Sequence, residues 1–366
     1  MKRALNHPAV KVIIGLLIGV ALLLPISRFV NLASSLYLVQ EHIMTPTGIA
    51  FTLLSGFFFI LAFAIRGARW KLFLNPEDHV KTGTAVRLVL VSTFINFLLV
   101  TGSGELARVL ILKRTHNIPV SRSLPSVAVD RSLDLLPALL IMIIVPFLGL
   151  QMDFKLWIVM GTVAGTFVAL IAFVGLTIWK RTAAIKLLHA ILRLLPRKIG
   201  SKIEAFATNL VDSLVVAVSR PRIFLPAISL TCVAVICDGL FAMFVFWATG
   251  LPMQFGAAIF GYTVFNMSFI LPSTPGRVGS NEIVGLLVFT GLLHFPADKV
   301  TAMFLVSHPW SALLMCGSGL VCLKSLGLTV SAALKMRPAN QAATVQEPAS
   351  AEEMVMEKEK FTPISM

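Results

Sequence analysis

The chain has 366 residues, of which 57% are hydrophobic and 13% charged, and its mean hydropathy is +0.88. This composition excludes an ordinary soluble globular protein, because several apolar runs reach the roughly 20 residues that a membrane-spanning helix needs. The net charge of +14 does not indicate a nucleic-acid-binding protein, because the basic residues gather at the ends of apolar runs, where the positive-inside rule places them. Cys232, Cys237, Cys316 and Cys322 lie within apolar runs and have no zinc-site spacing.

Several long apolar runs predict full membrane spans. The run 12–26 follows basic residues and has no small-residue cleavage site after it, which favours a retained helix over a signal peptide. The next run ends in an aromatic and basic stretch typical of the lipid headgroup level, so Arg66, Arg69 and Trp70 are its expected anchors. Headgroup binding by these three residues is the alternative. The predicted spans are 12–26, 48–65, 124–150, 156–179, 223–249 and 300–326.

Two further segments, 83–114 and 255–290, have the pattern of a membrane helix that breaks in the middle. In each, Gly or Pro interrupts an apolar run, and a short helical run then opens with Gly-Ser and carries a carboxylate. Such a short run crosses only about half of a hydrocarbon core. A shift of 177 positions (279 − 102) superposes the two segments. The superposed pairs are Gly102 and Gly279, Ser103 and Ser280, Glu105 and Glu282, and Pro119 and Pro296.

The distribution of basic residues predicts the topology. Stretches 2–11, 66–81, 113–122, 180–222 and 324–337 are rich in Lys and Arg, and the loops between them hold few. We expect the basic stretches on the cytoplasmic side, with both termini. The first broken segment then enters and leaves on the cytoplasmic side, and the second on the opposite side. The sequence therefore predicts an all-α integral membrane protein of about six full spans and two re-entrant broken-helix hairpins in an inverted repeat.

The predicted domain organisation is simple. Residues 1–335 form a single polytopic membrane domain, with the first repeat element at about 83–150 and the second at about 255–327. Stretch 180–222 is basic and amphipathic, so we expect a linker that lies on an anionic cytoplasmic membrane surface. Residues 336–366 are polar, acidic and rich in small residues, which predicts a disordered cytoplasmic tail.

The two breaks are the predicted functional site. Both short helices begin with a Gly-Ser pair, with Ser103 and Ser280 as expected N-caps. Their free N–H groups and positive dipole ends would point inward from opposite sides and could cradle a phosphate. The alternative is that both breaks are packing kinks filled by neighbouring helices. Two matched breaks in opposed orientation favour a substrate path.

Charged residues at membrane depth add to this site, because they face a cavity or a partner far more often than lipid. An alternative is a structural ion-pair network in which Glu105 pairs with Arg108, and Asp130 with Arg131. Asp238 lies mid-span, and His308 is either a packed kink residue or a proton carrier. The candidate substrate-binding residues are Gly102, Ser103, Gly104, Glu105, Arg108, Asp130, Arg131, Asp134, Pro275, Gly276, Arg277, Gly279, Ser280, Asn281 and Glu282.

Three motifs make the chain resemble a known family. Residues 66–72 read R-G-A-R-W-K-L, residues 104–108 read G-E-L-A-R, and residues 272–282 read P-S-T-P-G-R-V-G-S-N-E. In order and spacing, roughly residues 10–330 resemble the flippase-like transmembrane domain of lysylphosphatidylglycerol synthases, which many stand-alone bacterial and archaeal membrane proteins share. The resemblance implies a cytoplasmic-membrane protein that moves a phospholipid or a polyprenyl-linked lipid between leaflets.

The chain departs from this family in two respects. Its first break reads V-T-G at 100–102 where the family pattern has Pro-Gly, so we expect a looser geometry there. The aminoacyl-transfer domain of the synthases has no counterpart in these residues, so aminoacylation is not expected.

Three functions are compatible with these patterns. The first is a lipid translocase that works by alternating access, with an anionic headgroup held at the two half-helix N-termini. The second is an intramembrane lipid-modifying enzyme, which needs a nucleophile–base pair or a metal cluster, and seven scattered histidines argue against it. The third is a non-transporting partner of a glycosyltransferase or lipid synthase. We expect no catalytic residue, cofactor or metal, and no nucleotide-binding motif is present, so an ion gradient, the membrane potential or downstream consumption would supply the energy.

Overall fold

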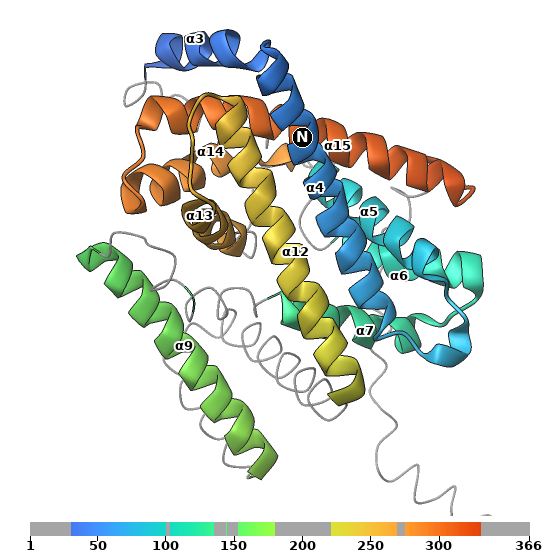
Figure 1. Cartoon of the computed structure of the whole chain (residues 1–366). Helices are drawn as coiled ribbons and strands as arrows, with labels where there is room; N and C mark the ends of the chain where they lie inside the picture. Colours follow the sequence, from blue (N-terminus) through green and yellow to red (C-terminus); the bar gives the residue numbers. More distant parts are fainter. Residues whose placement is uncertain are drawn as a thin grey trace, which may run out of the picture.

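The computed structural model describes residues 31–99, 103–134, 153–179, 221–268 and 275–330, together with residue 144, and the regular structure within them is helical. Figure 1 shows how the helices are arranged. They are α3 (Leu32–Ile43), α4 (Pro46–Lys71), η1 (Pro76–Asp78), α5 (Thr82–Leu98), α6 (Ser103–His116), α7 (Val120–Leu133), α9 (Phe154–Trp179), α12 (Pro221–Ala248), α13 (Phe255–Met267), η4 (Pro275–Arg277), α14 (Ser280–Gly285), the π-helix η5 (Leu286–Leu292) and α15 (Ala297–Ser325).

Three of the described helices, α4, α12 and α15, are long and apolar enough to cross a membrane, and α5 and α13 are shorter apolar helices. The predicted all-α architecture is confirmed. The helix α3 was not predicted; it begins where the Asn31 side chain accepts a hydrogen bond from the Ser34 N–H. The span predicted at 12–26, the linker 180–222, the tail 336–366 and most of 135–152 lie outside the described residues.

Helices α4 and α12 form the most extensive helix–helix contact and run antiparallel (Figure 1). Near the start of α4, the ring of Phe51 lies 5.3 Å from that of Trp247, at the end of α12. Near the end of α4, the Arg69 Nη1 donates at 3.0 Å to the Oγ1 of Thr231, in the first half of α12. The two helices therefore cross the molecule in opposite directions.

The sequence offset of 177 recurs in the helix boundaries. Helix α14 begins 177 residues after α6 (280 − 103), α15 begins 177 after α7 (297 − 120), and α12 ends 177 after α4 (248 − 71). The turns that precede α7 and α15 also match. Asn117 (φ 55°) and His294 (φ 60°) both adopt the left-handed conformation, which is uncommon for residues other than glycine. Pro119 and Pro296 then precede α7 and α15. We call the segments whose boundaries match at this offset the first and the second copy; they begin with α4 and α12, which are antiparallel.

In each copy, the segments on either side of the break pack against each other. Helix α6 lies so close to α5 that a methyl group on Gly104 would overlap the Ser92 carbonyl. Gly261 of α13 contacts the Phe289 ring of η5 just as closely. Glycine permits both approaches because it has no Cβ. In both copies, the helix before the break therefore packs against the helical segment that follows it.

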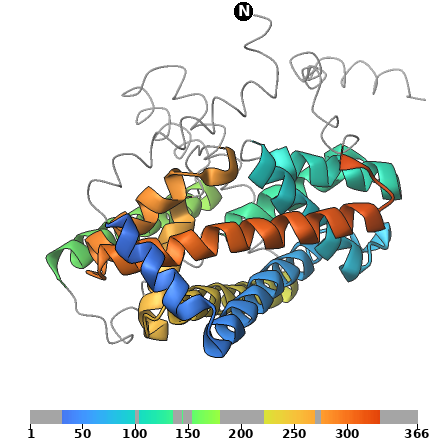
Figure 2. The ribbon, with the colours of Figure 1, turned by 90° about the horizontal axis from the view of Figure 1, so that it is seen from above.

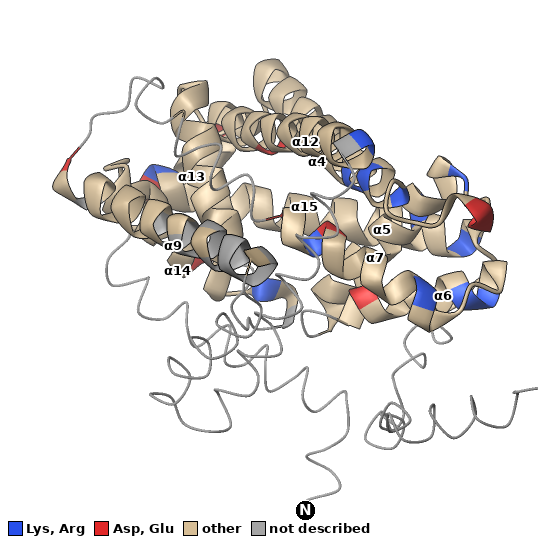
Figure 3. Ribbon diagram, turned by 90° about the horizontal axis from the view of Figure 1, so that it is seen from below, with Lys and Arg blue, Asp and Glu red and all other residues tan. Residues whose placement is uncertain are grey.

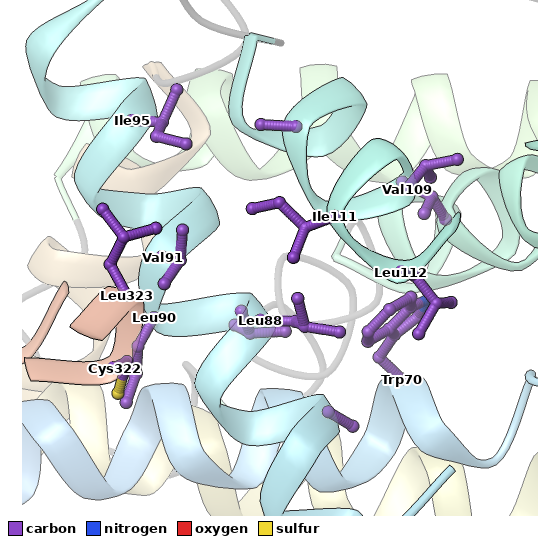
Figure 4. Packing of buried hydrophobic residues seen from close by; sticks show 14 of the residues in the cluster. Trp70, Leu88, Leu90, Val91, Ile95, Val109, Ile111, Leu112, Cys322 and Leu323 are labelled. Carbon is purple, nitrogen blue, oxygen red and sulfur yellow. The ribbon is translucent and has the colours of Figure 1, made fainter. Parts of the chain in front are cut away.

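The core consists of two main apolar clusters that α15 connects. One surrounds Trp70 and combines residues of α4, α5, α6 and α15; Figure 4 shows Trp70 beside Leu112 of α6. The other is aromatic and gathers Phe246 and Phe289 with residues of α13 and α15. Figure 2 shows α15 extending from the α13–α14 end of the described structure to the α5–α6 end. This helix therefore adds to the contact between the two copies that α4 and α12 make.

Candidate functional site

The described part of the second break lies against the end of α5, the helix that precedes the first break in sequence. The short helix η4, which belongs to the second break, contacts α5. A Cβ added to Gly276 would lie 3.9 Å from the Cζ of Phe97, in the last turn of α5 before the first break. Two segments nearly 180 residues apart in sequence are therefore neighbours in space. Gly102 lies outside the described residues, so its predicted role stays a prediction.

The second break has an unusual backbone. Gly276 (φ 66°), Arg277 (φ 59°) and Gly279 (φ 81°) all have a positive φ angle. For Arg277 this conformation is strained, and such strain is typically kept at functional sites. The break runs from Pro275, the first residue of η4, to α14, whose first turn contains Asn281.

The expected N-caps are wrong, because both serines are the first residues of their helices. Gly279 is the N-cap of α14, and the Ser280 hydroxyl donates to the Arg277 carbonyl at 3.0 Å. Helix α6 begins at Ser103, and the Asn96 side chain accepts from the Gly104 N–H at 2.7 Å. An amide on the preceding helix, rather than a local hydroxyl, therefore binds the N–H at the start of α6.

Glu282 and His308 connect the second break to α15. One carboxylate oxygen of Glu282 accepts from the Gly279 N–H at 2.7 Å, and the other lies 2.5 Å from the His308 Nδ1. The His308 Nε2 lies 2.8 Å from the Gly276 carbonyl oxygen. Both ends of the break are thus held by one pair of side chains.

Glu105 has the equivalent position in the first copy, and its partners lie on other helices. Its oxygens accept from the Asn96 Nδ2, both at 3.0 Å, and it forms an ion pair with Arg131 of α7. The predicted pairing of Glu105 with Arg108 is wrong, because Arg108 points towards Asp130 of α7. The pair Glu105–Arg131 and the pair Glu282–His308 are related by the same offset of 177 (282 − 105 and 308 − 131).

Arg69 is the centre of a buried charge network. Its Nε donates to the Asp130 Oδ1 at 2.9 Å, its Nη2 to the Asp134 Oδ1 at 2.6 Å, and its Nη1 to Thr231 at 3.0 Å. Its side chain is only 2% exposed. Arg131 pairs with Asp134 at 3.1 Å and not with Asp130, so the predicted Asp130–Arg131 pair is wrong. The network joins α4, α7 and α12.

The prediction that Arg69 and Trp70 anchor their helix at the headgroup level is also wrong. Trp70 is completely buried, and its Nε1 donates to the Ser126 Oγ at 3.0 Å. Arg66, the third predicted anchor, forms an ion pair with Asp238 of α12. These side chains face the interior because their hydrogen-bond partners lie there.

Arg108 has unused hydrogen-bonding capacity. Its guanidinium group is 4.3 Å above the Trp70 ring, and its Nη1 is 3.5 Å from Asp130. The residue is 2% exposed, and its Nε and Nη2 have no hydrogen-bond partner among the residues that the structure describes. A buried unsatisfied donor costs about 1–3 kcal/mol, and more when it is charged. A role in packing alone would not account for this free-energy cost.

Arginines lie beside both breaks, Arg108 in α6 and Arg277 in η4. Figure 3 shows charged residues along α6 and at the neighbouring end of α4, whereas most of α12 is uncharged. Within the described ranges, no group of three or more His, Cys, Asp or Glu side chains is placed to hold one metal ion.

Comparison with protein families identifies the chain. The family model described as lysylphosphatidylglycerol synthase TM region matches residues 12–319. The chain belongs to this family. Comparisons with curated proteins and with solved structures gave no match. Family membership confirms the resemblance seen in the sequence, and together with the long apolar helices it makes the protein an integral membrane protein of a family associated with membrane lipids.

Proposed function

We propose that the protein moves an amphipathic lipid with an anionic headgroup between the two leaflets, by alternating access and without chemical change in the lipid. The observation that carries this proposal is the contact of η4, which contains Arg277, with the end of α5, together with the buried Arg108 of α6, whose Nε and Nη2 have no hydrogen-bond partner among the described residues. A guanidinium group with free donors favours an anionic partner.

The antiparallel arrangement of α4 and α12 supports the finer topology. If α4 crosses the membrane in one direction, its counterpart α12 crosses in the other, which is the relation expected of an inverted repeat. We propose six full spans and two re-entrant hairpins, α5–α6 and α13–η5, that enter from opposite sides of a bacterial or archaeal cytoplasmic membrane. Interrupted backbone at membrane depth is tolerated where it is buried in protein or lines a water-filled cavity.

Arginine side chains are the best candidates to bind the headgroup. At the start of each half-helix one N–H already has a side-chain partner, Asn96 for Gly104 and Glu282 for Gly279. We therefore assign most of the recognition to guanidinium groups, which bind phosphate in a bidentate manner. Arg108 supports this assignment, because two of its buried nitrogens are without a partner among the described side chains and main-chain groups.

Reconstitution tests the proposal. Purified protein in liposomes is given a fluorescent phosphatidylglycerol, and a membrane-impermeant quencher reports how much of it changes leaflet. We expect rapid exchange with the natural protein and a loss of at least about tenfold with Arg277→Gln, since one charge-assisted hydrogen bond of 1.5–3 kcal/mol corresponds to roughly this factor. Arg122→Gln is the matched control, because Arg122 is half-exposed and pairs with Asp78 of η1.

Three outcomes would contradict the proposal. Liposomes with the natural protein that exchange lipid no faster than protein-free liposomes would overturn translocation. A change in lipid mass during the assay would favour an intramembrane enzyme. An equal loss in Arg122→Gln and Arg277→Gln would remove the argument that charge at the breaks is specific.

A further inference from the structure

The contacts of His308 determine where its protons lie. A carbonyl oxygen can only accept a hydrogen bond, so the Nε2 that lies 2.8 Å from the Gly276 oxygen must carry a proton. The Nδ1 lies 2.5 Å from a carboxyl oxygen of Glu282. A neutral histidine with its proton on Nε2 has a lone pair on Nδ1, and an ionised carboxylate would face it with another lone pair.

The contact between Nδ1 and Glu282 therefore requires one more proton. Either the imidazolium donates it to the carboxylate, or the carboxylic acid donates it to a neutral ring. In both cases the Glu282–His308 pair has bound one proton beyond an ionised glutamate and a neutral histidine. The geometry of these contacts fits the form of the pair that has bound this proton, which we call the loaded pair.

This proton holds the second break in place. Glu282 accepts from the Gly279 N–H, and His308 donates to the Gly276 carbonyl, so the loaded pair ties both ends of the strained turn to α15. Arg277 lies between these ends in the left-handed conformation. Without this proton, the lone pairs of the His308 Nδ1 and of the Glu282 carboxylate face each other. The contact between the two side chains then weakens, and the strained turn can relax.

The equivalent pair in the first copy lacks this property. Glu105 pairs with Arg131, whose guanidinium group stays protonated throughout the physiological range. The two copies therefore have the same carboxylate at the same position, but only the second has a partner that can release its proton. A change of pH acts on the two breaks differently.

Two charged residues of the described chain border His308: Glu282 of α14 contacts its Nδ1, and Arg277 of η4 follows Gly276, whose carbonyl oxygen contacts its Nε2. Other helices packed against α15 carry charged side chains whose partners are not His308, and η5 carries no charged residue. Arg66 of α4 pairs with Asp238 of α12. Arg87 of α5 donates to Ser325, and Glu41 of α3 lies near His42.

We propose that Glu282 and His308 form a proton-binding site that couples a pH gradient to lipid movement. A proton from the more acidic side binds the pair and closes the second break; its release to the other side opens the break. The coupling rests on the proposed function, whereas the proton-operated closure of the break does not.

Hydrogen exchange measured by mass spectrometry tests the closure in full-length protein in lipid nanodiscs. Glu282→Gln is the key variant, because the glutamine amide can donate to Nδ1 and accept from the Gly279 N–H at every pH, like the loaded pair. We divide the exchange rate of segment 275–285 in the natural protein by the rate in this variant. The division cancels most of the intrinsic pH dependence of amide hydrogen exchange. We expect this ratio to rise with pH, by up to about tenfold per unit where the pair titrates.

A flat ratio between about pH 5 and 8 would overturn the proton site. Glu105→Gln is the matched control, since it changes the equivalent carboxylate of the first copy and is expected to leave the pH dependence of segment 275–285 as in the natural protein. His308→Gln is the second variant, in case Glu282→Gln does not fold. It also removes the titratable ring, so it is expected to lose the pH dependence.

Liposomes with an imposed pH gradient then test the coupling. We expect the gradient to change the rate of lipid movement in the natural protein and to leave the rate of Glu282→Gln unchanged. If the natural protein moves lipid at a rate that ignores the gradient, the coupling is wrong and translocation stands. If it moves no lipid, translocation and coupling both fail, and the exchange ratio alone decides whether the pair closes the break.

Discussion

Removing Arg69 is the sharpest test of the buried charge network. Arg69→Met leaves Asp130, whose side chain is 6% exposed, without its principal partner and deprives Asp134 of a 2.6 Å hydrogen bond. Removing one partner of a buried ion pair typically costs about 3–5 kcal/mol, because the remaining charge is buried without compensation. For a chain of this length we expect the unfolding temperature to fall by on the order of 5–10 °C.

The native cysteines report this unfolding. Cys237 and Cys322 are free and buried, so a thiol-reactive fluorophore labels them only as the detergent-solubilised protein unfolds. The control is Arg131→Met, because the Arg131 side chain is 51% exposed and its pairs contribute about 1 kcal/mol or less. In the double variant Arg69→Met with Asp130→Asn, part of the loss should be recovered. If Arg69→Met unfolds at the same temperature as Arg131→Met, the reasoning from burial is refuted.

Three further substitutions test other parts of the argument. Gly104→Ala forces a methyl group against the Ser92 carbonyl, so the free energy of unfolding should fall by about 1–3 kcal/mol, measured in the same thermal assay. The control is Gly317→Ala, which should not destabilise the protein because no described atom lies within 4 Å of the added methyl group. Arg108→Met should keep or raise the unfolding temperature, because it removes a buried and partly unpaired charge, yet lower lipid exchange at least about tenfold. Arg131→His should make hydrogen exchange in the first half-helix depend on pH, and an unchanged pH profile there would contradict the equivalence of the two pairs.

Much of the fold could be predicted from the sequence, because membrane helices are set by length and apolarity. The span expected at 223–249 is α12 at Pro221–Ala248, and the span at 156–179 is α9 at Phe154–Trp179. The duplication was visible for a similar reason. Gly-Ser and a carboxylate at a constant offset mark the start of a helix, and both helices begin where that pattern indicates.

The partners of the charged residues could not be predicted in the same way. Spacing along one helix suggested that Glu105 pairs with Arg108, but both residues find partners on α7, and the packing of α7 against α6 is a tertiary property. The basic end of α4 suggested a lipid interface for the same reason, since only the position of Asp130 reveals that Arg69 points inward.

Some signals were present in the sequence and were not used. Asn96 is an amide in an otherwise apolar run just before the first break, which is an expensive position unless its side chain has a partner. The offset of 177 also relates Arg131 to His308, so the second copy of the Glu–cation pair could have been found without a structure.

The difference between Arg131 and His308 has a consequence for any mechanism based on two equivalent units. If both copies had the same pair, a change of pH would affect both breaks alike and could not favour one side of the membrane. With a permanent cation in one copy and a titratable ring in the other, protonation changes the relative stability of the two breaks. In the proposed alternating-access mechanism, protonation of the Glu282–His308 pair would favour closure of the second break without acting on the first.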